Sequence, residues 1–541
     1  MNKAEINFPG IHYNSNQIKI WIYAFTIISL SCLFMMMTNS TAQDSKTTDQ
    51  LSTINEIIPR PVSVISSHGS FTLNPNTIIY VVPDSSELIR IGQYLTSKLN
   101  LSTGYDIKVN PLQQEQKNGN IFLTLSDSDT LLGPEGYELK ITENAVYLSA
   151  SKPAGIFYGV QTIRQLLPPQ IESKTVKPGP WKIPAGIIRD YPRFGWRGAM
   201  LDVARHFFSA EDVKQVIDLL AYYKINRLHL HLADDQGWRI MINSWPNLTT
   251  YGGSTEVGGG KGGYYTQEQY SEIVKYASDR YIMIVPEIDM PAHVNAALAS
   301  YPELNCDSIS PALYNGITGK SSKLCTEKPV TYTFVDDVVK EISALTPGPY
   351  IHIGGDEALS MDSTDYKMFI KRVEAIVEKH HKHMIGWDEI VSSKPDSGTI
   401  VQHWNSRFAK QTLQSSLPVI MSPASKMYMD MKYNITIKLG LKWAGYINVK
   451  TAYDWDPGTF LSGLPEKRIM GIEAPLWTET VKNINDIEFM MFPRICGYAE
   501  LGWSPAAIRY WDEYRVRLAS HGPRLKEMGV NFYKSALVNW K

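Results

Sequence analysis

Repeated alternation of short apolar segments with helical segments, beginning near residue 196, constrains the fold of this chain most strongly. Eight segments have the length and the β-branched or aromatic content of buried strands, and amphipathic stretches such as SAEDVKQVIDLLAYYK separate most of them. These strand candidates are RGAMLDV, INRLHLHL, YIMIVPEID, YIHIGG, HMIGWDE, TIVQHW, LPVIMS and IMGIEAPLW. Eight strands with crossover helices over roughly 300 residues predict an α/β protein with a (β/α)8 TIM barrel. A doubly wound open sheet is the alternative, but no glycine-rich phosphate loop supports it.

The region before this alternation has a different pattern. Residues 56–185 contain short alternating runs such as GYELKITENAVYLSAS, together with two helical stretches, SELIRIGQYLTSKLN and AGIFYGVQTIRQLLP. This mixture predicts a small α+β accessory domain in front of a barrel domain at 190–541. The proline-rich stretch 176–195, VKPGPWKIPAGIIRDYPRFG, is interpreted as the linker between them.

The N-terminus has the pattern of an export signal. Lys19 precedes the apolar segment IWIYAFTIISLSCLFMMM, and the small, polar residues TNSTAQDS follow it. We expect residues 1–42 to be a signal peptide cleaved after Ala42, and residues 43–55 to be a flexible segment. The protein would then be exported to the periplasm or secreted. The apolar segment is also about long enough to span a bilayer, so an uncleaved membrane anchor is the alternative.

Cysteine positions and net charge predict the covalent links of the chain and the class of partner that it binds. Cys306 and Cys325 flank a polar loop and are expected to form a disulfide, which an exported protein permits, whereas Cys496 lies in an apolar context and is expected to be a buried free thiol. Lys and Arg number 53 against 54 Asp and Glu, without a long basic run, so nucleic acid is not an expected partner.

Acidic residues and tryptophans gather directly after the predicted strands. In a (β/α)8 barrel, the active site lies at the carboxyl ends of the strands. Residues at these ends are Asp202, Arg205, Asp234, Asp235, Trp238, Glu287, Asp289, His293, Asp356, Glu357, Trp387, Asp388, Glu389, Trp404, Tyr428, Asp430, Trp477 and Glu479. Indole rings beside carboxylates are typical of a pocket that stacks on sugar rings and binds their hydroxyl groups.

Two adjacent acids, Asp356 and Glu357, stand out in the segment HIGGDE. Hydrolysis of a glycosidic bond usually takes two carboxylates ~5–9.5 Å apart, on opposite sides of the bond. The Cα atoms of neighbouring residues are only ~3.8 Å apart. Such a pair is poorly placed to flank one bond, so we expect that one of the two acids does not perform the usual second role.

Three histidines permit a different chemistry. His229 and His231 alternate along one predicted strand, and with His293 and an aspartate they could hold Zn²⁺ in a hydrolase. The alternative is that these histidines fill the barrel or orient the acids by hydrogen bonds, because alternating residues of a barrel strand share one face.

Several segments together resemble one known family. HIGGDE resembles the His-x-Gly-Gly-Asp-Glu signature of family 20 glycoside hydrolases, the β-N-acetylhexosaminidases. HLHLADDQGWRI, PEIDMPAHVNAAL, GWDEI, VQHWN, YMDM, LGLKWAGY, EAPLWTE and FPRICGYAELGWSP resemble other blocks of that family, in its order. IIPRPVSV and GIFYGVQTIRQLL resemble its accessory domain. The sequence departs from the family pattern at Ala233, where Thr is usual, and at Ala292, where Gly is usual.

The resemblance implies substrate-assisted retaining catalysis without a metal or cofactor. In this mechanism the substrate's own 2-acetamido oxygen attacks the anomeric carbon. Glu357 would be the general acid and then the general base, and Asp356 would orient the acetamido group. Other substrate-binding positions implied by the family are Arg205, Asp234, His293, Trp387, Trp404, Tyr428, Asp430, Trp443, Trp477 and Glu479. We further expect burial and the charge of Asp356 to raise the pKa of Glu357, while Asp356 stays ionised.

The expected activity is exo-hydrolysis of terminal GlcNAc or GalNAc from glycans or chitin oligosaccharides. A lacto-N-biosidase-type or other retaining glycosidase on the same barrel is the closest alternative. More distant alternatives are a glycosidase with Glu479 as a protein nucleophile, the metal hydrolase described above, and a non-catalytic glycan-binding protein. The choice between GlcNAc and GalNAc and the neighbouring sugar are not encoded in these motifs, and a dimer is only an analogy with the family.

Overall fold

The computed structural model describes residues 54–82, 84–112, 118–126, 129–319 and 321–541. The predicted signal peptide lies outside the described residues, as does residue range 43–53 of the predicted flexible segment. Ile54, at the end of that segment, is fully buried. Among the described residues, no helix is long and apolar enough to cross a membrane.

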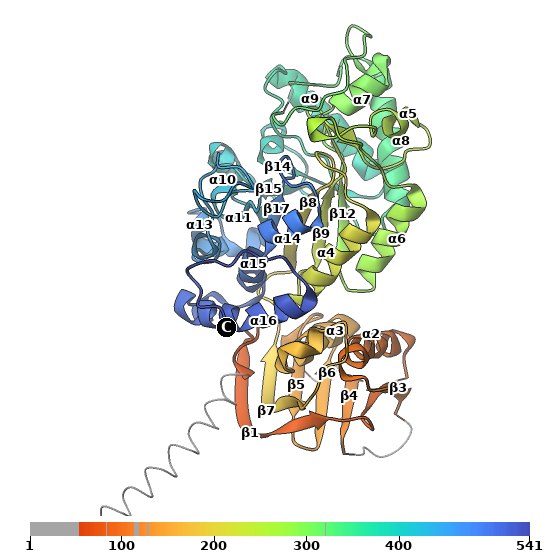
Figure 1. The fold of residues 1–541 in the computed structure, drawn as a ribbon. Coiled ribbons are helices and arrows are strands. Elements are labelled where there is room, and N and C mark those ends of the chain that lie inside the picture. The colour runs from red at the N-terminus through yellow and green to blue at the C-terminus, as the bar shows by residue number, and fades with distance from the viewer. Residues whose placement is uncertain (1–53, 83, 113–117, 127–128, 320) are drawn as a thin grey trace, which may run out of the picture. The chain divides into compact units, whose positions relative to one another are not determined.

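Eight parallel strands form a closed barrel at the centre of the second domain (Figure 1). The strands are β8 (Trp196–Asp202), β9 (Arg227–His231), β12 (Met283–Glu287), β13 (Tyr350–His352), β14 (His383–Trp387), β15 (Ile400–His403), β16 (Val419–Met421) and β17 (Ile469–Leu476). Each corresponds to one predicted segment, so the (β/α)8 prediction is confirmed and the open doubly wound sheet is wrong.

The register aligns polar residues at the carboxyl ends of neighbouring strands. Asp202 of β8 pairs with His231 of β9, His231 pairs with Glu287 of β12, and Glu287 pairs with His352 of β13. All four residues are buried. Four strands therefore deliver their last residues to one level of the barrel, and the candidate site is built on this level.

Helices cover the first half of the barrel more regularly than the second half. The longer helices are α4 (Ala210–Tyr222), α6 (Gln267–Ser278), α8 (Pro329–Leu345), α9 (Ser363–Lys379), α14 (Ile484–Met491), α15 (Arg494–Trp503) and α16 (Trp511–Met528). After β14 the chain forms only the 3₁₀ helix η5 (Asp388–Ser393), because the following residues KPDSG cannot continue a helix. The other short helices are α5 (Asn247–Thr250), α7 (Asn295–Ser300), α10 (Ala409–Gln414), α11 (Ala424–Met427), α12 (Val449–Tyr453) and α13 (Pro457–Phe460).

The accessory domain is a seven-stranded mixed sheet with two helices on one face. In spatial order its strands are β1 (Ser63–Leu73), β7 (Trp181–Asp190), β5 (Tyr137–Ile141), β6 (Ala145–Ala150), β4 (Asn120–Leu125), β2 (Ile78–Val82) and β3 (Lys108–Pro111). The helices α2 (Ser86–Thr103) and α3 (Pro153–Leu166) correspond to the two predicted helical stretches.

The linker interpretation is wrong for Trp181–Asp190, which forms β7 between β1 and β5. Proline inside a strand usually argues against that strand, because it removes a backbone donor. Here Pro184 pairs with Ser70 of β1, while only Gly186–Asp190 pairs with β5. Pro184 therefore lies in the part of β7 that needs no donor toward β5, and the strand tolerates it.

Both cysteine predictions are confirmed. Cys306 and Cys325 form a disulfide, and Cys496 is a buried free thiol. Burial raises the pKa of the Cys496 thiol to about 12, so it stays protonated and behaves as a small apolar side chain.

Candidate active site

The two glycines before Asp356 allow the chain to turn sharply at the end of β13. Gly354 and Gly355 have φ values of +66° and +89°, in the region that favours glycine. A Cβ atom on Gly354 would lie 1.8 Å from Asp289 Oδ1, and one on Gly355 would lie 2.6 Å from Ile390 Cγ2. The backbone thus passes directly against the segments that follow β12 and β14, and it delivers Asp356 and Glu357 to the mouth of the barrel.

Substituting Gly354 by alanine is expected to lower the free energy of unfolding by roughly 2–4 kcal/mol, because strain at positive φ adds to a collision with Asp289. Denaturant unfolding measures this loss. Gly529→Ala is the matched control, since Gly529 has φ +80° but nothing within 4 Å of the added methyl group. Equal losses in the two variants would show that the contact with Asp289 is not tight.

Histidines and carboxylates form a continuous network inside the barrel. Glu287 Oε2 accepts a hydrogen bond at 2.9 Å from His229 and another from His231, and Glu287 Oε1 lies 2.9 Å from His352 Nδ1. Glu287 Oε1 also accepts from the Trp387 indole at 3.0 Å. The three imidazoles and this carboxylate therefore fix one another at the floor of the site.

This network bears on the metal hypothesis. The second ring nitrogen of His229 forms a 2.8 Å hydrogen bond with Glu473 Oε1, and that of His231 forms a 3.0 Å hydrogen bond with Asp234 Oδ2. Both ring nitrogens of both histidines are thus engaged by carboxylates, so a metal ligand set including them would require these bonds to break. The arrangement supports the alternative in which the histidines orient the acids.

Glu473 is a member of this network that the sequence reasoning did not single out. It is fully buried in β17 and accepts from Trp196 Nε1 at 2.9 Å and from Gln402 Nε2 at 2.9 Å, besides contacting His229. A lone acid within the apolar strand GIEAPL was the available signal, because an acid in a barrel interior must be paired.

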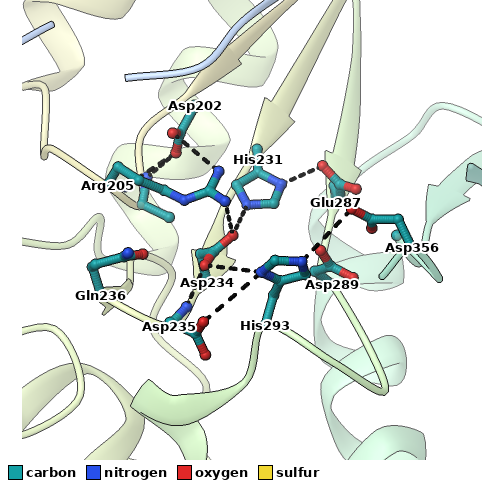
Figure 2. Close-up of polar contacts among 12 residues, drawn as sticks. Asp202, Arg205, His231, Asp234, Asp235, Gln236, Glu287, Asp289, His293 and Asp356 are labelled. Carbon is teal, nitrogen blue, oxygen red and sulfur yellow. Dashed lines mark hydrogen bonds and ion pairs between the residues drawn. The ribbon is translucent and has the colours of Figure 1, made fainter. Parts of the chain in front are cut away.

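A chain of charged contacts connects Arg205 to the two adjacent acids, and Figure 2 shows it as far as Asp356. Arg205 donates toward Asp202 at 3.3 Å and pairs with Asp234 at 2.7 Å. On the other side of Asp234, His293 Nδ1 lies 3.5 Å from Asp234 Oδ1. His293 Nε2 then faces both adjacent acids, 3.7 Å from Asp356 Oδ2 and 3.5 Å from Glu357 Oε2.

The charge on His293 follows from its neighbours. Burial opposes it, but Asp234 raises the pKa of His293 well above its ordinary value. Burial also opposes the charge on Asp234, yet Arg205 and His293 hold the pKa of Asp234 well below its ordinary value. His293 is therefore a cation held against the two adjacent acids.

The pKa order of the adjacent acids is the reverse of the expectation from the sequence. Burial and the neighbouring Glu357 raise the pKa of Asp356 to about 6. Asp356 Oδ1 is buried and has no hydrogen-bond partner within the described parts of the chain. The contact with His293 lowers the pKa of Glu357, whose side chain is 52% exposed. The predicted rise for Glu357 is thus wrong, because Glu357 is the solvated member and the one that His293 contacts more closely.

Four aromatic side chains form one wall of the site. Trp404 stacks on Tyr428 with ring centroids 6.4 Å apart, and Trp443 meets the Tyr428 ring edge-on at 5.6 Å. Trp477 lies 6.4 Å from Tyr428, with the Arg205 guanidinium 4.8 Å over its ring. These predicted residues therefore do come together, with Trp443, 57% exposed, at the rim.

Trp387 occupies a different place from the other tryptophans. Its side chain is 0% exposed, and its ring lies 5.9 Å from that of Trp477. Its indole nitrogen donates a hydrogen bond to Glu287. Trp387 supports the wall from beneath and presents no surface to solvent.

Two further acids have unused hydrogen-bonding capacity. Neither carboxylate oxygen of Asp430 has a partner among the residues that the structure describes, and Glu479 Oε2 also lacks one there. Burial, together with Glu479, raises the pKa of Asp430 well above its ordinary value. Burial raises the pKa of Glu479 as well, although Arg205 opposes this. Unsatisfied buried acceptors are costly, so both acids are suited to bind hydroxyl groups of a ligand.

Glu389, which contacts Trp404 of the aromatic wall, is a third acid with a raised pKa. Its Oε2 accepts from Trp404 Nε1 at 3.1 Å. Burial and the nearby Asp356 raise the pKa of Glu389 to about 8, so it is neutral at pH 7. The protonated acid can fix the Trp404 ring without adding a second negative charge beside Asp356.

Two parts of the chain match descriptions of one protein family. Residues 194–506 match Glycosyl hydrolase family 20, catalytic domain, and residues 55–191 match Glycosyl hydrolase family 20, domain 2. The chain is 39% identical over 489 residues to a beta-N-acetylhexosaminidase of Cellulomonas fimi, an alignment that covers 90% of this chain and 97% of that protein. It is 35% identical over 503 residues to a beta-hexosaminidase of Porphyromonas gingivalis (strain ATCC BAA-308 / W83), covering 88% of this chain and 64% of that protein.

Solved structures of β-N-acetylhexosaminidases also resemble this chain. The GH20 beta-N-acetylhexosaminidase from Streptomyces coelicolor A3(2) superposes with a TM-score of 0.88 at 48% sequence identity, over 90% of this chain and 99% of that chain. A beta-hexosaminidase of Streptomyces plicatus, solved in complex with Thio-NAglucal, has a TM-score of 0.87 at 48% identity, over 90% of this chain and 98% of that chain. With matches to both domains and a barrel whose acids, histidines and tryptophans meet at one end, the chain belongs to glycosyl hydrolase family 20.

Proposed function

We propose that this protein is an exo-acting β-N-acetylhexosaminidase that removes terminal β-linked N-acetylhexosamine from carbohydrates by substrate-assisted retaining catalysis. The observation that carries the proposal is the adjacency of Asp356 and Glu357 at the barrel mouth, beside His293 and the aromatic wall. Two neighbouring acids are poorly placed to flank one bond from opposite faces, which favours a nucleophile supplied by the substrate. Membership in family 20 and the relatives named above support this reading.

In the first step, Glu357 donates its proton to the glycosidic oxygen while the acetamido oxygen of the substrate attacks the anomeric carbon. The bond to the leaving group breaks, and an oxazolinium ion forms on the sugar. Asp356 accepts a hydrogen bond from the acetamido nitrogen and stabilises the positive charge that develops there. Its buried, unpartnered Oδ1 provides the acceptor for this bond.

In the second step, Glu357 takes a proton from water, which attacks the same carbon and opens the ring of the intermediate with net retention. His293, held as a cation by Asp234, lies 3.5 Å from Glu357 and stabilises its anionic form between the two steps. Arg205, Asp430 and Glu479 bind hydroxyl groups of the terminal sugar, and Tyr428, Trp404 and Trp477 surround its acetamido group.

The pH dependence of kcat/KM follows from the reversed pKa order. Asp356 and Glu357 titrate as a coupled pair, and the productive form carries one proton, on Glu357. The upper pKa of the pair, near Asp356, is about 6, and the lower one is below the ordinary value of a glutamic acid. We expect a bell-shaped profile that falls above about pH 6, as the last proton leaves the pair, and again at low pH.

This profile can be measured with an aryl GlcNAc substrate across pH 3–9, in steps of about half a unit. The Glu357→Gln variant provides the control, because it has no dissociable proton on that side chain and should lose the alkaline limb. A wild-type plateau that extends to pH 8 would contradict the assigned order.

A panel of aryl β-glycosides of GlcNAc, GalNAc, glucose and lacto-N-biose tests the proposed function, with the released product identified. Rapid release of GlcNAc or GalNAc, without glucose or lacto-N-biose, is expected. Inhibition by GlcNAc-thiazoline tests the mechanism, because this compound resembles the cyclic intermediate. Indifference to the thiazoline together with a trapped glycosyl ester on Glu479 would instead support a protein nucleophile.

We also infer export of the protein, on the basis of the N-terminal apolar segment and the Cys306–Cys325 disulfide, which an oxidising compartment stabilises. N-terminal sequencing of the mature protein tests this inference. A new N-terminus directly after Ala42 is expected, whereas retention of the apolar segment would support a membrane anchor.

A further inference from the structure

A cavity of about 310 Å³ lies beside Glu357 and is not accounted for by the groups assigned above to the terminal sugar. The segment after β13 contributes Leu359 and Met361 to its lining, and the segment after β15 contributes Arg407 and Phe408. Glu357 and Trp404 also line it, so the cavity borders the candidate active site.

The chemistry of the reaction indicates what occupies this cavity. A general acid must come within hydrogen-bond reach of the oxygen that it protonates, about 2.6–3.2 Å. In glycoside hydrolysis that oxygen belongs to the leaving group, which must therefore lie against Glu357. The terminal sugar occupies the other side, among Asp356, Tyr428 and Asp430. This step rests on the proposed function.

When the glycosidic bond breaks, the side chains that line the cavity carry a positive charge that no negative charge among them balances. The acidic and basic side chains that line it are Glu357, Glu389 and Arg407, and the phenol of Tyr366, which also lines it, stays neutral because burial raises its pKa well above the ordinary value. Glu389 is neutral at pH 7, because burial and Asp356 raise its pKa to about 8. Glu357 carries the proton that it donates. Arg407 is exposed, and within the described residues it makes no ion pair; its guanidinium lies 5.5 Å from its neighbour's ring, that of Phe408. The leaving group therefore meets a single uncompensated positive charge.

We propose that this cavity binds the leaving group, and that Arg407 makes the enzyme prefer N-acetylhexosaminides whose leaving group carries a carboxylate or sulfate, such as a uronic acid or a sulfated sugar. A guanidinium binds both anions through charge-assisted hydrogen bonds. Leu359, Met361 and Phe408 supply the apolar surface on which the ring of that sugar rests.

The test compares two aryl substrates that differ in charge but have nearly the same leaving-group acidity. They are the N-acetyl-β-glucosaminides of 3-(4-hydroxyphenyl)propanoate and of its propanamide, in which two methylene groups separate the charge from the phenol. For wild-type protein, we expect kcat/KM for the acid to exceed that for the amide by roughly two- to fivefold, the worth of one partly exposed ion pair. In Arg407→Met, this ratio falls to about one or below.

The ratio is internal to each variant, so a variant that folds incompletely does not disturb it. Arg407→Lys should retain part of the preference, and high salt should lower the wild-type ratio. Arg515→Met is the matched control, because Arg515 is a surface residue of α16 that pairs with Asp512 and should leave the ratio unchanged. A GlcNAc–glucuronate disaccharide compared with chitobiose extends the test to natural leaving groups.

Three results would overturn the inference. A wild-type ratio of one, with both compounds hydrolysed, would leave the proposed function intact but show that the cavity does not select anions. A preference that persists in Arg407→Met would assign it to another residue. If wild-type protein hydrolyses neither compound, the proposed function is itself wrong and the inference falls with it.

Discussion

Glu357→Gln is expected to lower kcat for a GlcNAc disaccharide by roughly 10²- to 10⁴-fold, the usual contribution of a general acid and base. Gln is nearly isosteric with Glu but cannot donate a proton to the glycosidic oxygen. The loss in kcat/KM should shrink for a 2,4-dinitrophenyl leaving group, because that group departs without protonation. Steady-state kinetics on the two substrates measure both effects.

The position of Glu357 makes this variant informative. Its side chain is 52% exposed and lies 3.5 Å from His293 Nε2, so replacement removes one ion pair without opening the core. Glu378→Gln, on the exposed face of α9, is the matched control and should leave both rates unchanged. Equal losses of kcat/KM on activated and unactivated substrates would show that Glu357 does not protonate the leaving group.

Asp356→Asn is expected to lower kcat on N-acetylated substrates by roughly 10²- to 10³-fold, because the carboxylate that stabilises the charge on the acetamido nitrogen is lost. Binding of GlcNAc-thiazoline should weaken in the same variant, since the inhibitor resembles the intermediate that Asp356 contacts. Inhibition kinetics measure this second effect. A variant that is nearly fully active on an aryl GlcNAc substrate would show that the mechanism is wrong.

The Asp356→Asn variant should lose activity but gain stability against unfolding. A carboxyl whose folded-state pKa is raised to about 6 destabilises the folded protein once it ionises, and the penalty grows as pH rises from about 4 to 6. Asparagine carries no charge, so the variant should gain up to about 2–3 kcal/mol of unfolding free energy at pH 7.5 and almost nothing at pH 4. Unfolding measured at both pH values tests this, and a loss of stability at pH 7.5 would contradict the raised pKa of Asp356.

Local patterns were sufficient to predict the architecture. Each of the eight barrel strands carries its own apolar, β-branched signal, and the crossover helices lie next to them in the chain. The pairing of Cys306 with Cys325 was predictable for a similar reason, because only a short polar loop separates them. Segment 176–195 was misjudged because Pro184 suggests a linker, and only the long-range pairing of β7 with β1 and β5 shows that a proline is tolerated there.

The sequence by itself determined the barrel, the family, and the position of the two adjacent acids at the end of a barrel strand, since short motifs and strand ends fix all three. Only the tertiary structure decided which acid is buried and which is solvated, and it reversed the expected pKa order of Asp356 and Glu357. It likewise placed Trp387 beneath the site, connected Glu473 to the histidine network, and brought Arg407 and Glu357 to the lining of one cavity. The reason is that pKa values and ligand contacts depend on burial and on distances between side chains far apart in the chain, which no local pattern encodes.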